Sequence, residues 1–141
     1  MRMFQVCVCG QPLQLKEQPT PQPAGTEVLL KVLAAGVCHS DVHLWEGYFD
    51  MGGGNKYSTA KTMNPPRTMG HEIVGEVVAV GPGSTGAKVG DKAVVYPWIG
   101  CGKCGYCQGG TENRCPTPHA LGVNEDGGYA VCGRSGPARS S

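Results

Sequence analysis

The sequence of 141 residues has no excess of charge of either sign and few aromatic side chains. Twelve lysines and arginines oppose eleven aspartates and glutamates, which gives a formal net charge of +1. This balance argues against a basic surface for nucleic acid or for an anionic membrane. Aromatic residues make up 6% of the chain, too few for a surface on which bases stack. We therefore expect no nucleic acid and no membrane among the partners of this protein.

The sequence also lacks the long apolar segments of a membrane helix or a secretory signal. No apolar run approaches the roughly 18 residues that are needed to cross a bilayer. Residues 1–6, MRMFQV, carry one positive charge but no apolar stretch and no small-residue cleavage site. These absences predict a cytoplasmic protein, in which clustered cysteines are metal ligands rather than disulfides.

The chain has no internal repeat and no long amphipathic helix, and its length suits about one domain. Instead, 23 glycines and 11 prolines separate short runs of valine, isoleucine and leucine, which is typical of strands joined by turns. We predict strands over residues 4–9, 13–18, 27–37, 73–80 and 93–95, a brief helix over 38–46 that Gly47 ends, and a loop over 50–68. The predicted fold is mainly β, a partly open barrel with few short helices.

Four cysteines at regular spacing form the most specific motif. Cys101, Cys104 and Cys107 are each separated by two residues, and Cys115 follows after seven more. Four thiolates with intervening glycines can enclose one tetrahedral Zn²⁺, and such a closed site is structural. We call residues 100–116 the zinc lobe. The alternatives are four reduced buried cysteines or an iron–sulfur cluster, although bacterial ferredoxins have three residues, not seven, before the last cysteine.

A second group of metal-ligand types is divided between two distant segments. Cys38 follows a predicted strand, and His71 and Glu72 open another. Cysteine and histidine are ligands of catalytic zinc sites, which keep one coordination position open. Each residue also has a simpler interpretation: Cys38 as a small core residue, His71 as a surface histidine, and Asp41 as a helix N-terminal carboxylate. The residues alone leave these alternatives open.

Taken together, three motifs resemble the N-terminal half of the zinc-dependent medium-chain alcohol dehydrogenases. They are GVCHSD at 36–41, GHE at 70–72 and the four-cysteine lobe. The resemblance runs from about Phe4 to Ala130 and includes the segment Gly128–Ala130. It implies a GroES-like catalytic domain of the dehydrogenase/reductase superfamily. Such a domain carries one structural and one catalytic Zn²⁺.

The resemblance also implies a role for each matching residue. Cys38 and His71 correspond to ligands of the catalytic zinc, and Glu72 to an acidic neighbour that approaches or transiently ligates it. Asp41 corresponds to the carboxylate that orients the ligating imidazole. Ser40 and His43 correspond to a proton relay, and His39 to a basic residue that faces the cofactor pyrophosphate. Trp45 and Trp98 either line the substrate pocket or pack in the core.

The implied activity is oxidation of a small alcohol to an aldehyde or ketone with NAD or NADP, in family members that are homo-oligomers when full length. Two alternatives from other classes remain: a non-catalytic GroES-like zinc-binding module, and a small iron–sulfur electron carrier. In neither alternative would Cys38 and His71 have to bind a metal together.

The segment GPGSTG at 81–86 satisfies the dinucleotide-binding pattern G-x-G-x-x-G. We interpret it as a turn between strands, because the residues after it lead to a strand and not to a helix. We therefore expect residues 1–132 to be the catalytic domain, with the Rossmann cofactor domain absent. Residues 133–141 are expected to be the flexible polar tail of a truncated or frame-disrupted product. Cys132 does not match the family's third zinc ligand, so we expect a weak catalytic zinc and negligible NAD(P) turnover by this chain alone.

Overall fold

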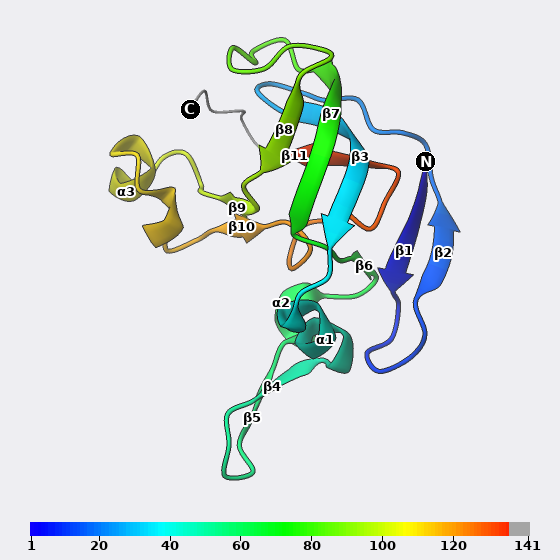
Figure 1. The fold of residues 1–141 in the computed structure, drawn as a ribbon. Coiled ribbons are helices and arrows are strands. Elements are labelled where there is room, and N and C mark those ends of the chain that lie inside the picture. Colours follow the sequence, from blue (N-terminus) through cyan, green and yellow to red (C-terminus); the bar gives the residue numbers. More distant parts are fainter. Residues whose placement is uncertain (136–141) are drawn as a thin grey trace.

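A four-stranded antiparallel sheet forms the centre of the fold, which the computed structural model describes for residues 1–135 (Figure 1). Its strand order is β11-β3-β7-β8. The bounds are β3 (Val28–Gly36), β7 (Glu72–Val80), β8 (Lys92–Val95) and β11 (Cys132–Ser135). The long strands β3 and β7 pair from Val28–Val80 to Gly36–Glu72. This ladder brings the end of β3 next to the start of β7.

The alternation of side chains along these strands explains the main core. Ile73 and Val77 of β7 are buried, whereas Val74 and Val78 point outward and are exposed, as the period of two along a strand requires. The core cluster consists of Val28, Leu30, Ile73, Val77, Val95 and Leu121. These β-branched and leucine side chains supply the apolar burial that stabilises the sheet.

A second core lies below the end of this sheet, where a smaller sheet and the helices meet. The smaller sheet has the order β2-β1-β6, with β1 (Arg2–Val6), β2 (Gln14–Glu17) and β6 (Arg67–Thr68). The helices are α1 (His39–Glu46) and α2 (Ala60–Met63). Val6, Leu44, Met63 and Met69 form the buried cluster, with Cys9, Trp45, Val123 and Tyr129 packed against it.

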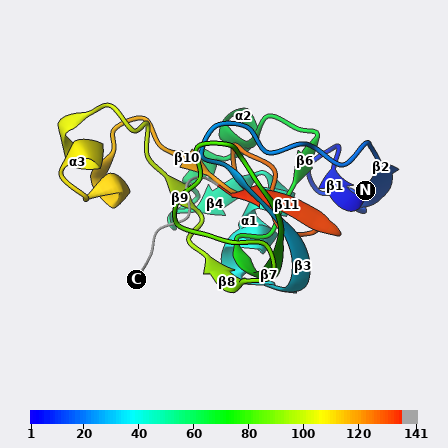
Figure 2. The same ribbon diagram turned by 90° about the horizontal axis from the view of Figure 1, so that it is seen from above.

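Two extensions leave this body. The hairpin of β4 (Tyr48–Asp50) and β5 (Lys56–Ser58) projects from the end that carries α1 (Figure 1). The zinc lobe projects from the side, as the view from above shows (Figure 2). It contains α3 (Gly105–Gln108) and the 3-10 turn η1 (Glu112–Arg114). It joins the body through the strand pair β9 (Trp98–Ile99) and β10 (His119–Ala120).

The predicted fold class is confirmed. The described residues are mostly strands with three short α-helices, and their strands close no barrel. Residues 13–18 contain β2, which pairs with β1. The helix predicted over 38–46 is α1, and Gly47 ends it with a φ of +86°. The segment 81–86 lies in the connection between β7 and β8, where no helix follows it. No helix within residues 1–135 has the length and apolar character to cross a bilayer.

Two predictions about irregular segments are wrong. Residues 50–68, predicted as a loop, contain β5, α2 and β6 and the last residue of β4. Residues 133–135, predicted as part of a flexible tail, belong to β11, which pairs with β3 from Cys132–Lys31 to Ser135–Val28. The polar composition of this stretch does not prevent pairing, because an edge strand is held by backbone hydrogen bonds to its neighbour. The rest of the predicted tail lies outside the described residues.

Candidate metal centres

The ladder between β3 and β7 places the first pair of candidate ligands. Gly36, the last residue of β3, pairs with Glu72, the first residue of β7. Cys38 lies just beyond that end of β3, and His71 lies just before β7. Their side chains converge, with the Cys38 Sγ 3.1 Å from the His71 Nε2. The structure therefore brings together two ligand types that are 33 residues apart in the sequence.

Asp41, in the first turn of α1, joins the two segments from one side. Its side chain is buried, and it accepts hydrogen bonds from the Cys38 N–H at 3.1 Å and from the Gly70 N–H at 3.2 Å. Its Oδ1 also lies 3.6 Å from the His71 Nδ1, longer than a hydrogen bond but within ion-pair distance. One carboxylate thus holds the backbone N–H of Cys38 and that of the residue before His71, and it faces the imidazole nitrogen that does not contact Cys38.

The donor set fits a zinc ion. Ligand atoms of Cys38, Asp41 and His71 all lie within 4.8 Å of one another. Thiolate and imidazole are the ligands that Zn²⁺ prefers, and a carboxylate beside the second ring nitrogen is the usual support of a zinc-bound histidine. Because both Asp41 oxygens already accept backbone N–H groups, this carboxylate is suited to orienting His71 rather than to binding the metal.

Glu72 is the predicted site residue that the structure keeps apart from this group. Its exposed side chain lies over Gly36, where an added Cβ would collide with the carboxylate. Among the described residues, the group of converging ligand atoms does not include Glu72. Its approach to a metal stays a prediction.

The predicted relay residues lie along α1. Ser40 is half-buried in the first turn, and His43 follows about one turn later. The His43 ring lies between His39 and Phe49, at centroid distances of 4.4 Å and 4.8 Å. Its Nδ1 is buried and lies 3.5 Å from a Glu46 carboxylate oxygen. Both side chains come from α1, and their part in a proton path stays a prediction.

The other candidate side chains of this region face different surroundings. His39 is exposed at the start of α1. Trp45 packs against the second core and donates its indole N–H to the Gln11 carbonyl at 2.7 Å. Trp98 is 38% exposed in β9. The packing of Trp45 favours its role as a core aromatic.

Sequence reasoning missed Tyr129 as a part of this site. Its hydroxyl donates a hydrogen bond to the Gly36 carbonyl at 3.3 Å. Burial raises the pKa of the Tyr129 hydroxyl, and the nearby negative charges of Asp41, Cys38 and Glu72 raise it further. The only sequence signal was the resemblance of Gly128–Ala130 to the family, which assigned no role to the tyrosine.

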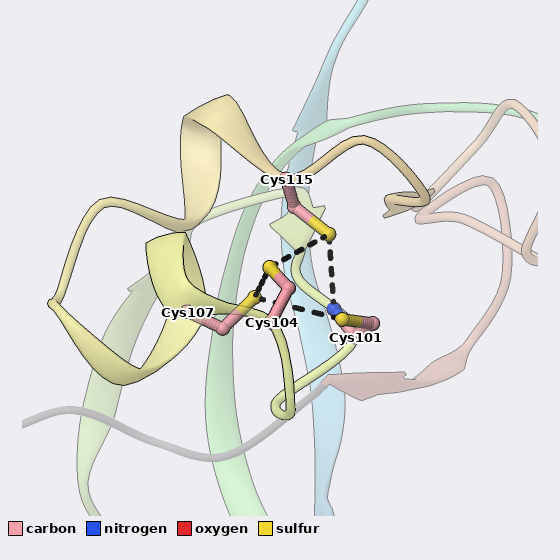
Figure 3. Close-up of side chains that lie close together, drawn as sticks. All are labelled: Cys101, Cys104, Cys107 and Cys115. Atoms are coloured by element: carbon pink, nitrogen blue, oxygen red, sulfur yellow. Dashed lines mark hydrogen bonds between the residues drawn. The ribbon is translucent and has the colours of Figure 1, made fainter.

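The four cysteines of the zinc lobe converge in the second centre (Figure 3). Their sulfur atoms lie 4.0 Å apart for Cys101–Cys107, 3.5 Å for Cys104–Cys107 and 3.9 Å for Cys104–Cys115. A tetrahedral ion with Zn–S bonds of about 2.3 Å requires sulfurs about 3.8 Å apart. The arrangement of the four sulfur atoms therefore fits one structural zinc ion.

The environment of the lobe favours ionisation of some of these thiols. Hydrogen bonds from the backbone N–H groups of Lys103 and Cys104 lower the pKa of Cys101 to about 6. A backbone hydrogen bond from Cys101 likewise lowers the pKa of Cys115. In contrast, burial raises the pKa of Cys107 to about 11. A cation at the centre would be needed to hold all four as thiolates near neutral pH.

The mainly β topology, the cysteine lobe and the separate thiol–imidazole pair agree with the GroES-like catalytic domain that the sequence motifs resemble. The alcohol dehydrogenase GroES-like domain family matches residues 24–134. This chain belongs to that family.

Individual relatives agree with this assignment. The chain is 44% identical over 130 residues to an NAD-dependent alcohol dehydrogenase from Sulfurisphaera tokodaii, covering 92% of this chain and 37% of that protein. It is 40% identical over 121 residues to an L-threonine 3-dehydrogenase from Pyrococcus horikoshii, covering 86% of this chain and 32% of that one. The structure resembles a cobalt- and zinc-bound alcohol dehydrogenase from Pyrobaculum aerophilum, with a TM-score of 0.79, 33% identity and coverage of 96% and 39% of the two chains.

The chain thus spans about a third of the length of these two relatives, 37% of one and 32% of the other.

Proposed function

We propose that residues 1–132 work as the catalytic domain of a zinc-dependent alcohol dehydrogenase, with residues 100–116 as its structural zinc lobe. The reaction is oxidation of a small alcohol to an aldehyde or ketone, with NAD or NADP as the hydride acceptor. The observation that carries the proposal is the contact of 3.1 Å between the Cys38 thiol and the His71 imidazole. Family membership and relatives named as NAD-dependent alcohol dehydrogenases support it.

In this proposal, Cys38 and His71 hold the catalytic zinc, and Asp41 keeps the His71 ring in place. The bound ion supplies Lewis acidity toward the oxygen of the substrate. Ser40, in the first turn of α1, accepts the proton that the alcohol loses. His43, about one turn further along α1, passes a proton on toward solvent. The Glu72 carboxylate lies over Gly36, so its side chain would have to change conformation before it could approach the ion.

The remaining parts of the proposal concern the cofactor, assembly and location. His39 is exposed at the start of α1, where it is free to face a pyrophosphate. NAD or NADP binds through the Rossmann domain that the family resemblance implies, and full-length members form homo-oligomers. A reducing compartment such as the cytoplasm suits the four free thiols of the zinc lobe.

The first test is the zinc content of the purified chain. In protein equilibrated with excess zinc, which also fills the weak catalytic centre, we expect two zinc ions per chain. Cys38→Ser should remove one and leave the zinc lobe loaded, whereas Cys104→Ser should remove the other. Cys7→Ser is the matched control, because Cys7 belongs to neither group of converging ligands. If the wild type binds a single zinc ion and Cys38→Ser does not remove it, the result would favour the non-catalytic module. Bound iron with visible absorbance would favour the electron carrier.

The second test asks whether the Cys38 centre accepts an alcohol. Co²⁺ replaces zinc there, and small primary and secondary alcohols are added while the d–d absorption bands are recorded. The proposal predicts a shift of these bands that is absent in Cys38→Ser. Bands that no alcohol changes would argue against a catalytic centre even if the metal is present.

A further inference from the structure

We propose that Tyr129 is a positioning residue that holds the Cys38 and His71 side chains at their contact distance. It does so by tying the end of β3 to the residue before His71. This inference rests on the proposed function, because it assumes that the two side chains share a metal. It assigns a role to a residue that lies 93 positions from its hydrogen-bond partner in the sequence.

The backbone of Tyr129 is fixed on both sides. Its N–H donates to the Met69 carbonyl at 3.0 Å, and its carbonyl accepts the N–H of Phe4 at 2.8 Å. The neighbouring Gly128 N–H donates to the Gly70 carbonyl at 2.8 Å. Tyr129 therefore lies between β1 and the segment that leads into His71, and its side chain starts from a well-defined position.

The side chain of Tyr129 contacts both ligand-bearing segments. Its hydroxyl bonds to the carbonyl of Gly36, two residues before Cys38. Its ring packs on Gly70, the residue before His71. A Cβ added to Gly70 would lie only 2.6 Å and 2.8 Å from the ring carbons Cδ1 and Cε1. The ring thus occupies the space that a side chain at position 70 would need.

Tyr129 and Asp41 connect the same two segments through different atoms. Asp41 accepts the N–H groups of Cys38 and Gly70, whereas Tyr129 donates to a carbonyl of the first segment and packs on the second. The β3–β7 ladder ends at the Gly36–Glu72 pair, so it does not itself restrain the residues beyond. A two-ligand site needs such restraint, because its affinity depends on ligands that are held in place before the metal arrives.

The test uses the full chain with zinc in the lobe and Co²⁺ titrated into the Cys38 centre. Tyr129→Phe removes the hydroxyl and keeps the ring on Gly70. Loss of one neutral hydrogen bond should weaken Co²⁺ binding by about threefold to tenfold and shift the d–d bands. Tyr129→Leu removes the ring as well and should weaken binding about 10- to 100-fold, as losses of supporting contacts around metal ligands do.

The controls separate positioning from general stability. Tyr57→Phe makes the same chemical change on the exposed strand β5 and should leave Co²⁺ binding unchanged. Zinc in the lobe should stay bound in every variant. A purely structural role for Tyr129 would lower the melting temperature of the metal-free protein but leave the affinity and d–d bands of Tyr129→Phe as in the wild type.

Wild-type affinity and bands in Tyr129→Phe would overturn this inference while the proposed function stands. If the wild type binds no second metal that Cys38→Ser removes, both the inference and the proposed function are wrong.

Discussion

At the scale of single residues, Cys101 and Cys107 belong to one group of thiols but have opposite pKa shifts. Backbone N–H groups hold the pKa of Cys101 at about 6, and burial holds that of Cys107 at about 11. The thiolate is the form that reacts with alkylating agents, so each rate rises as the pH passes the pKa. We predict the alkylation seen in a short labelling pulse given immediately after a chelator removes the zinc, before the lobe unfolds. Alkylation of Cys101 then reaches half its maximum near pH 6, while Cys107 stays unreactive up to pH 9.

This prediction is checked by iodoacetamide labelling from pH 5 to pH 9, with mass spectrometry of the labelled peptides. In urea, the Cys101 midpoint should return toward the unperturbed value of about 8.5. Zinc should protect both cysteines. Equal rates for Cys101 and Cys107 in the labelling pulse would contradict the opposite pKa shifts of the two thiols.

The residues that sequence analysis identified are those whose chemistry is local or whose motif is distinctive. The spacing of Cys101, Cys104 and Cys107 is enough to indicate a shared metal. The proximity of Cys38 and His71 could be predicted only from the family resemblance, because the residues between them carry no pattern that indicates the contact. Tyr129 could not be identified, because its contacts with Gly36 and Gly70 exist only once β1, β3 and the 68–70 segment are assembled.

At the scale of elements, two glycines with nearly the same positive φ occupy different surroundings. Gly10 and Gly122 have φ values of +74° and +75°. A Cβ at Gly10 would meet nothing within 4 Å, whereas a Cβ at Gly122 would lie 2.9 Å from three backbone atoms of Gly70. We predict that Gly10→Ala costs about 1–2 kcal/mol through backbone strain alone, and Gly122→Ala about 2–4 kcal/mol because the backbone must also move.

Urea denaturation of the two variants measures this difference directly. Gly122→Ala should also weaken the metal at Cys38 and His71, because the displaced Gly70 immediately precedes His71. Gly10→Ala serves as the control for the φ effect. Equal losses of stability would mean that the crossing of Gly122 over Gly70 is looser than the structure indicates.

The elements that sequence analysis missed are those held by pairing rather than by apolar pattern. Strand β11 has the sequence CGRS and no alternation of apolar residues, but it completes the edge of the central sheet beside β3. The strands β4 and β5 have three residues each and flank a glycine-rich tip. Lys56 lies over the Tyr48 ring at 3.7 Å, a contact that forms only when the hairpin closes. In contrast, β3 and β7 are long and rich in valine, leucine and isoleucine, and this apolar pattern was sufficient to predict both as strands.

At the scale of the whole molecule, the zinc lobe and the body are stabilised by different means. Within residues 100–116, all of which the structure describes, the buried side chains are Cys107 and Cys115. Helix α3 has four residues, far fewer than a helix needs for stability on its own. The two apolar clusters consist of body residues, with Ile99 and Leu121 at the junction with the lobe. The lobe therefore depends on its metal, and the body does not.

We predict that removal of the lobe zinc unfolds the lobe alone. In Cys104→Ser, amide hydrogen exchange should become fast between residues 101 and 116. The Leu121 N–H, bonded to the Pro97 carbonyl at 2.9 Å, should stay protected by the core. The melting temperature of the body should fall by less than about 4 °C, since few of its contacts change. Cys38→Ser should leave lobe protection intact, because Cys38 belongs to a separate group of ligand atoms from the four lobe cysteines. Loss of protection at Leu121 in Cys104→Ser would show that strands β9 and β10 transmit lobe unfolding into the core.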